Sequence, residues 1–123
     1  CMEVAECVTE LMNAATSFHK LHLKITGQGS FASHSALKIY EDFHDFSDNL
    51  CESFQGAYGE ILTYKEVLPR TLNTKQEGIT YLQDLKTMVT ELQSKLPYSE
   101  IINDLDLCKS KINGALYKLK FLS

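Results

Sequence analysis

Apolar side chains recur at steps of three and four residues along four stretches of the chain, which is the period of an amphipathic helix. The first predicted helix runs from Met2 to Ile25 and the second from Ser33 to Gln55, and glycines follow both. The third begins at Thr74 and is stopped by Pro97, and the fourth carries apolar positions from Ile101 to Leu122. Because no alternating pattern predicts a strand, we expect an all-α protein.

The connections between these helices differ in length. About seven residues around Gly27 join the first two helices, and a tight turn at Pro97 joins the last two, so both pairs are expected to be antiparallel hairpins. Sixteen residues, Tyr58 to Asn73, lie between the second and third helices. At about 3.3 Å per residue this connection spans roughly 50 Å, more than the roughly 36 Å of a 24-residue helix. It therefore predicts a four-helix bundle with a long crossover, and an up-down bundle with a loose loop is the alternative.

The start of the third helix carries a more specific signal. Thr74 and Glu77 have the spacing of a capping box, in which each side chain accepts a hydrogen bond from the other residue's backbone N–H. This pair predicts the point at which the crossover ends and the helix begins.

Length, composition and charge limit the kind of protein. At 123 residues with 44% hydrophobic content, the chain is expected to form a single domain, residues 1–123, with one core. The formal charge of -4 lacks the clustered basic stripe of nucleic-acid-binding proteins. No apolar run approaches the roughly 18 residues of a membrane span, so we expect a soluble, cytoplasmic protein. Because the chain opens on Cys1, a few residues are expected to precede it, with Met2 as an alternative start.

The four cysteines match neither a zinc motif nor a dense disulfide framework, and we expect reduced thiols. The four histidines, in contrast, all fall between positions 19 and 44. Asp48 and Glu52 follow them and lie one helical turn apart, so that their oxygens can converge on one cation. Imidazole together with carboxylate suits iron, zinc or manganese. A metal site is therefore one interpretation, and ordinary surface or core histidines are the other.

Two further histidines are candidate ligands. Glu41 and His44 have the Glu-x-x-His spacing of di-iron bundles, but such sites need a second copy of this motif, and the chain has none. We therefore expect Glu41 and His44 to lie on a solvated helix face. His19 is expected to be exposed, or to support His22 from outside the coordination shell.

The segment from His22 to His34 resembles the signature of the Dps-type miniferritins, members of the ferritin-like superfamily. In that family a histidine near the end of the first helix precedes a short Gly-containing loop, and a second histidine stands twelve residues after the first. Here His34 is twelve residues after His22, and Gly27 is five residues after it. Asp48 and Glu52 are similar to the Asp-x-x-x-Glu pair of the same family. The resemblance covers roughly residues 15–56, and the run 52–56 is most similar to small Dps-like proteins of bacteriophages.

The resemblance implies a ferritin-like four-helix bundle with a long crossover between helices 2 and 3. It further implies an Fe2+-oxidising centre, with zinc or manganese as alternative metals, made of His22 and His34 from one subunit and Asp48 and Glu52 from its twofold partner. It implies a hollow homo-oligomer of twelve subunits built from dimers, which stores ferric iron in the host cytoplasm or in a virion. DNA binding, known in cellular members, is expected to be absent or weak because three acids lie among the first ten residues.

Three departures from the family pattern support an alternative. Leu23 stands where the family usually has a tryptophan, the chain is short, and Asp48 follows His34 by fourteen residues rather than fifteen. One residue fewer turns the carboxylates by about 100° on a helix. Either a local distortion of the helix absorbs this turn, or the site is degenerate and the protein is a phage structural or interaction protein.

Overall fold

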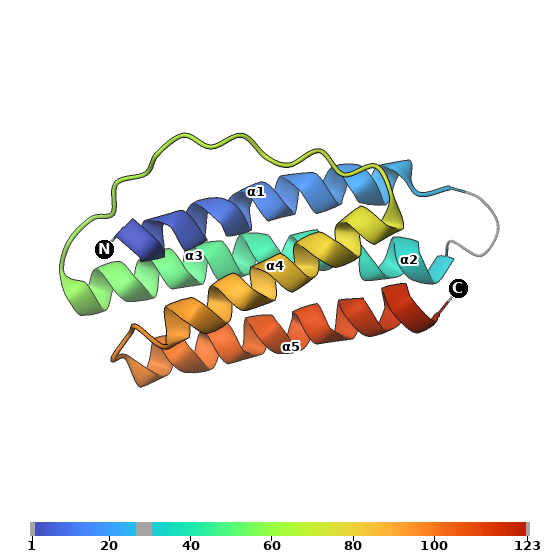
Figure 1. Ribbon diagram of the computed structural model, residues 1–123. Coiled ribbons are helices and arrows are strands. Elements are labelled where there is room, and N and C mark those ends of the chain that lie inside the picture. Colours follow the sequence, from blue (N-terminus) through green and yellow to red (C-terminus); the bar gives the residue numbers. More distant parts are fainter. Residues whose placement is uncertain (1, 27–30, 123) are drawn as a thin grey trace.

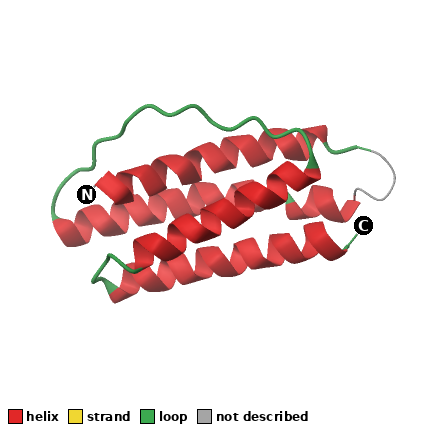
Figure 2. Cartoon of the chain, viewed as in Figure 1, coloured by secondary structure: helices red, strands yellow, loops and turns green. Residues whose placement is uncertain are grey.

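The computed structural model describes residues 2–26 and 31–122, and all regular structure in these two ranges is helical (Figure 2). The helices are α1 (Met2–Lys24), α2 (Phe31–Ala36), α3 (Ile39–Tyr58), α4 (Lys75–Gln93) and α5 (Ser99–Phe121). The end of α1 is followed by the short α2 at one end of the molecule. From there α2 and α3 form one interrupted column (Figure 1). With that column counted once, the expected all-α arrangement of four helices is confirmed.

The crossover segment, residues 59–74, runs along the outside of the bundle over α1 from one end to the other (Figure 1). Consequently α3 and α4 run in the same direction, while α1 and α5 run in the opposite direction and pack against both of them. Every packed neighbour among these four columns is therefore antiparallel. The long crossover predicted from the sequence is present, and the loose-loop alternative is wrong.

The second predicted helix differs from the observed one. It was expected to be continuous from Ser33 to Gln55, but Leu37 and Lys38 form a turn that separates α2 from α3. Across this turn the backbone N–H groups of Lys38, Tyr40 and Glu41 bond the carbonyl three residues earlier. Such bonds turn the chain by about 120° per residue instead of about 100°. The interruption therefore rotates α3 about the column axis relative to a continuous α-helix.

The core is formed by the apolar faces of all the helices. Phe18 stacks on Tyr81 with ring centroids 5.4 Å apart and contacts Phe43 at 5.7 Å, which joins α1, α3 and α4. The remaining large, fully buried side chains are Phe54, Leu11, Leu21, Leu37, Leu82, Leu85, Ile101, Ile112 and Leu119. Cys7 and Cys108 are also buried and, like Cys51, are free thiols. The predicted apolar stripes are thus confirmed as the inner faces of the helices.

The capping box of α4 is present with both of its reciprocal bonds. Thr74 Oγ1 accepts a hydrogen bond from the N–H of Glu77 at 3.1 Å, and Glu77 Oε1 accepts one from the N–H of Thr74 at 3.1 Å. The other end of α4 was predicted less well, because the helix ends at Gln93 rather than at Pro97. Proline disfavours helical geometry at the residue before it, so the chain leaves the helix earlier.

Side chains of α1 hold the crossover segment in place. Asn13 donates to the carbonyl of Val67 at 2.9 Å, Ser17 to that of Arg70 at 2.7 Å, and Lys24 to that of Leu72 at 3.1 Å. These three residues follow one another along α1, and their partners follow in the same direction along the crossover. The segment is therefore tied to α1 in a defined register although it has no regular secondary structure.

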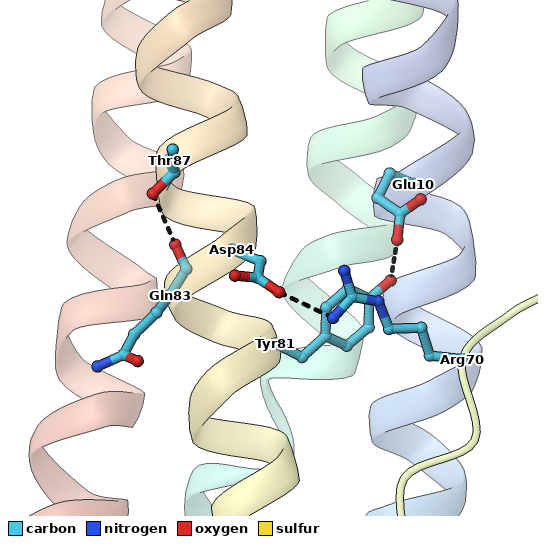
Figure 3. Close-up of polar contacts among 6 residues, drawn as sticks. All are labelled: Glu10, Arg70, Tyr81, Gln83, Asp84 and Thr87. Atoms are coloured by element: carbon cyan, nitrogen blue, oxygen red, sulfur yellow. Dashed lines mark hydrogen bonds and ion pairs between the residues drawn. The ribbon is translucent and has the colours of Figure 1, made fainter.

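A polar cluster ties the crossover to α4 as well (Figure 3). The guanidinium of Arg70 lies 4.2 Å from the centroid of the Tyr81 ring and bonds Asp84 at 2.9 Å. The hydroxyl of the buried Tyr81 donates to the carboxylate of Glu10 on α1 (Figure 3). Burial, reinforced by Glu10, raises the pKa of Tyr81 well above its ordinary value. Arg70 is the only arginine of the chain, and through Tyr81 this cluster links the crossover and α4 to α1.

Candidate metal site

His22 and His34 form a stacked pair where α1 meets α2. Their ring centroids are 3.7 Å apart, with an angle of 25° between the ring planes. The Nδ1 atom of His22 lies 2.8 Å from the carbonyl oxygen of His34, and the Nδ1 atom of His34 lies 3.2 Å from the carbonyl oxygen of His22. Each ring is therefore oriented by the backbone of the other residue. The two histidines thus lie side by side within one chain.

These hydrogen bonds determine which ring nitrogen can bind a metal. A carbonyl oxygen only accepts hydrogen bonds, so each Nδ1 must carry the proton. In the neutral ring the lone pair is then on Nε2, and Nδ1–H bonded to a backbone carbonyl is the usual arrangement of metal-binding histidines. The donor set of this pair thus fits a borderline cation such as Fe2+ or Zn2+.

Helix ends position the two rings. His22 lies in the last turn of α1 and His34 in the last turn of the short α2. The glycine loop between them, with Gly27 and Gly29, falls outside the described residues. His22 is buried, whereas His34 is partly accessible, so an ion would reach the pair from the side of His34.

Two aromatic neighbours support the pair. Tyr40, in the first turn of α3, contacts His22 with ring centroids 5.6 Å apart and stacks on His19 at 4.1 Å. His19 is exposed, which is one of the two arrangements expected for it. The contacts of Tyr40 with both histidines were not predicted from the sequence.

Asp48 and Glu52 lie elsewhere in the same chain. Both are exposed on α3, one turn apart on one face of the helix, as expected. The stack of His19 on Tyr40 shows which positions of the antiparallel α1 and α3 are level with each other. By that register the carboxylates lie about 13 residues, or roughly 20 Å, along the bundle from His22. Within residues 2–26 and 31–122 no three His, Cys, Asp or Glu side chains form a group that could hold a metal ion.

The other candidate ligands have different roles. Glu41 and His44 are exposed on α3, as predicted for a solvated face. Burial raises the pKa of the Cys7 and Cys108 thiols to about 12, which disfavours the thiolate that a metal would need. The thiol of Cys51 lies 3.0 Å from the hydroxyl of Tyr64 on the crossover segment. The histidine pair is thus the arrangement in the described part of the chain that most resembles a metal site.

The fold and this pair define an all-α, antiparallel four-helix protein with two oriented imidazoles at one end. No family model, curated protein or solved structure matches the chain. None of the described helices combines the length and the apolar character needed to span a membrane.

Proposed function

We propose that the chain is a Dps-like, ferritin-like protein that binds and oxidises Fe2+ at sites shared between two copies and stores ferric iron in an oligomeric shell. The observation that carries this proposal is the reciprocal bonding of His22 and His34, which leaves Nε2 as the unprotonated nitrogen of two neutral, stacked rings. A surface histidine has no need of such orientation. The crossover topology is the connection found in ferritin-like bundles and supports the same class.

The separation of the ligands supports a shared site. Two imidazoles alone hold a labile cation weakly, and oxygen ligands are needed to complete its coordination. Asp48 and Glu52 cannot supply them to the histidines of their own chain across roughly 20 Å. In a twofold dimer, however, the carboxylates of one copy can lie beside the histidines of the other.

Iron is the substrate of the proposed reaction. Two Fe2+ ions each give up one electron, and one hydrogen peroxide molecule takes both electrons and two protons to leave as two water molecules. Dioxygen is the alternative oxidant. His22 and His34 would hold the ion through Nε2, while Asp48 and Glu52 would balance its charge and favour the more highly charged Fe3+ product.

The test is Fe2+ oxidation by peroxide, monitored through the absorbance of the ferric iron that forms. His22→Ala and Asp48→Asn should each lower the initial rate at least about tenfold, since even outer-shell changes cost about that much. The matched controls are His44→Ala and Asp45→Asn, which change exposed residues of the same types on α3. Equal rates in the site variants and their controls would contradict the proposal.

One observation favours a second function. Leu23 is 69% exposed beside His22, where the family usually has a tryptophan. An apolar side chain there suits a protein contact better than ion entry, as in a phage structural or interaction protein with a degenerate site. A purified protein that binds no Fe2+, Zn2+ or Mn2+ yet assembles would favour this alternative.

A further inference from the structure

The outward face of α5, on the side of the bundle away from the crossover, carries a helical pattern of its own (Figure 1). Six exposed residues follow one another there at steps of four and three, and we call them the outer seam: Asn103, Leu107, Ser110, Gly114, Tyr117 and Phe121. Leu107, Tyr117 and Phe121 are 55%, 56% and 72% exposed, and the rings of Tyr117 and Phe121 contact each other with centroids 5.9 Å apart. Such steps repeat every seven residues, as they do where one helix of a coiled coil packs on another. The outer seam thus has the spacing of a packed helix face, but the described part of the chain leaves it exposed.

Gly114, in the middle of the outer seam, is not explained by the fold of one chain. It lies in the interior of α5, where only proline is less favourable than glycine. A Cβ atom added there would meet nothing within 4 Å, and the positive φ found at Gly59 is not found at Gly114. Neither a contact nor the backbone conformation therefore requires glycine at this position. Glycine on an exposed helix face does allow another backbone to approach closely.

Charged residues flank the outer seam in a regular order. Lys118 lines a hollow between α5 and α3, and Lys120 lines one between α5 and α4, so these two lysines lie on opposite flanks. Asp104 precedes Lys118 by fourteen residues, and Asp106 precedes Lys120 by the same two heptads, so each acid shares a flank with one lysine. Neither Asp104 nor Lys118 has an ion-pair partner among the residues that the structure describes. Each flank is therefore acidic in its first half and basic in its second half.

This order of charges is complementary to itself in one orientation. If two α5 helices packed in parallel, each residue would face its own copy, so acids would meet acids and lysines would meet lysines. In an antiparallel pair centred at the level of position 112, Asp104 lies beside the partner's Lys118, and Asp106 lies beside the partner's Lys120. The twofold axis forms each of these pairs twice. The charges thus favour an antiparallel second copy over a parallel one.

The side chains of the outer seam match in the same register. Leu107 and Tyr117 are each five residues from position 112, so Leu107 packs on the partner's Tyr117 twice in the dimer. Ser110 and Gly114 are each two residues from position 112, so Ser110 lies opposite the partner's Gly114. Small residues therefore meet near the axis, where the two helix backbones come closest, and apolar pairs lie on both sides of them. This arrangement gives a reason for the glycine in the middle of α5.

We infer that the outer seam is a self-association surface, on which α5 of a second copy of the chain packs antiparallel about a twofold axis at the level of position 112. The proposed metal ligands lie on α1, α2 and α3, so this inference does not rest on the proposed function. Two different twofold contacts in one chain can together build an assembly of more than two copies. A contact through the outer seam is thus an addition to a shared metal site.

The first experiment is sedimentation equilibrium of the metal-free full chain at low ionic strength, where exposed charges are least screened. Asp104→Lys and Lys118→Asp should each raise the dissociation constant of self-association at least about fivefold, because two attractive pairs become repulsive. The double variant with both changes should return to within about twofold of the wild type, because the reversed charges again form opposite pairs. Positions 104 and 118 are about 21 Å apart along α5, so a contact within one chain cannot produce this recovery.

The matched control is Asp45→Lys, which makes the same change of charge at an exposed residue of α3 and should leave the dissociation constant unchanged. Circular dichroism of all the variants should show wild-type helix content, since each changed side chain is exposed. This comparison separates an effect of the outer seam from an effect of net charge.

A cross-linking experiment tests the direction and register of the two helices. A mixture of Leu107→Cys and Tyr117→Cys chains should form disulfide-linked heterodimers under mild oxidation, in excess of the homodimers that either variant forms alone. In the antiparallel pair, position 107 faces position 117 of the partner. Two copies of position 107 lie roughly 15 Å apart along the helices, which is beyond the reach of a disulfide.

The outcomes distinguish this inference from the proposed function. A wild type that remains monomeric at hundreds of micromolar, a double variant that does not recover, or preferential linkage of position 107 to its own copy would overturn the inference. An assembly that depends on the outer seam but does not oxidise Fe2+ would refute the proposed function alone. Fe2+ oxidation by a protein whose assembly is insensitive to Asp104→Lys and Lys118→Asp would refute the outer seam alone.

Discussion

Mixing two variants that are each expected to be inactive gives a quantitative test of the proposed shared site. The changes are His34→Ala, which removes an imidazole, and Asp48→Ala, which removes a carboxylate on α3. Each pure variant should be inactive, because every site then lacks one ligand. A mixed dimer contains one site that combines the histidines of the Asp48→Ala chain with the carboxylates of the His34→Ala chain, and this site is complete.

The expected magnitude follows from the twofold arrangement. Random pairing of equal amounts makes about half of all dimers mixed, and one of the two sites in each mixed dimer is complete, so about a quarter of the wild-type rate should return. When His44→Ala replaces His34→Ala in the mixture, about half of the rate should remain, because only the Asp48→Ala change then inactivates sites. The ratio of these two values does not depend on the absolute activity of the protein.

The assay is the initial rate of Fe2+ oxidation per chain after co-expression or after mixing in denaturant and refolding. Native mass spectrometry of tagged chains verifies that mixed dimers have formed. No recovery in verified mixed dimers would show that the site lies within one chain or that no such site exists. If both pure variants are inactive and the mixture is active, the site cannot be confined to one chain.

Three further predictions concern the polar cluster, the buried thiols and nucleic acid. Tyr81→Phe removes a hydrogen bond to a carboxylate and should lower the free energy of unfolding by about 1.5–3 kcal/mol in urea titrations, whereas Asp84→Asn breaks an exposed ion pair and should cost at most about 1 kcal/mol. Equal costs would contradict the buried role of Tyr81. The thiols of Cys7 and Cys108 have a pKa raised from 9.0 to about 12. Their contribution to the free energy of unfolding is therefore complete below pH 9 and is lost as the pH rises toward 12. The expected loss is roughly 1.4 kcal/mol per pH unit for each thiol. Unfolding measured between pH 8 and about 11 should show this decline, and Cys7→Ala with Cys108→Ala should flatten it. Duplex DNA should not be retarded in gel shifts at about 0.15 M salt and low micromolar protein, because a chain of net charge -4 releases few counterions; clear retardation would overturn this expectation.

Local signals in the sequence predicted most of the fold. The Thr74 and Glu77 pair fixed the start of α4 because a capping box depends on four consecutive residues alone. The interruption at Leu37 and Lys38 was missed since neither residue is a helix breaker, and the turn depends on how α2 and α3 each pack on α5. Helical period predicted which apolar residues are buried, but it did not predict which loop residues enter the core.

The candidate site was predicted only in part, because its contacts join residues that are far apart in the sequence. That His22 and His34 belong to one site was implied only by the family resemblance, and their stacking and reciprocal hydrogen bonds were not predicted. The cluster of Arg70, Tyr81 and Glu10 joins positions up to 71 residues apart, and no periodic pattern indicates such a contact. The presence of a single arginine in the chain was the one available signal.

The crossover also determines the order in which the molecule can fold. The antiparallel pairs α1 with α3 and α4 with α5 are each joined by short connections, so they can form early, whereas contacts between the pairs close loops of about 50 to 70 residues. During synthesis, the first hairpin therefore leaves the ribosome with its inner apolar face uncovered, and it stays aggregation-prone until α4 and α5 arrive.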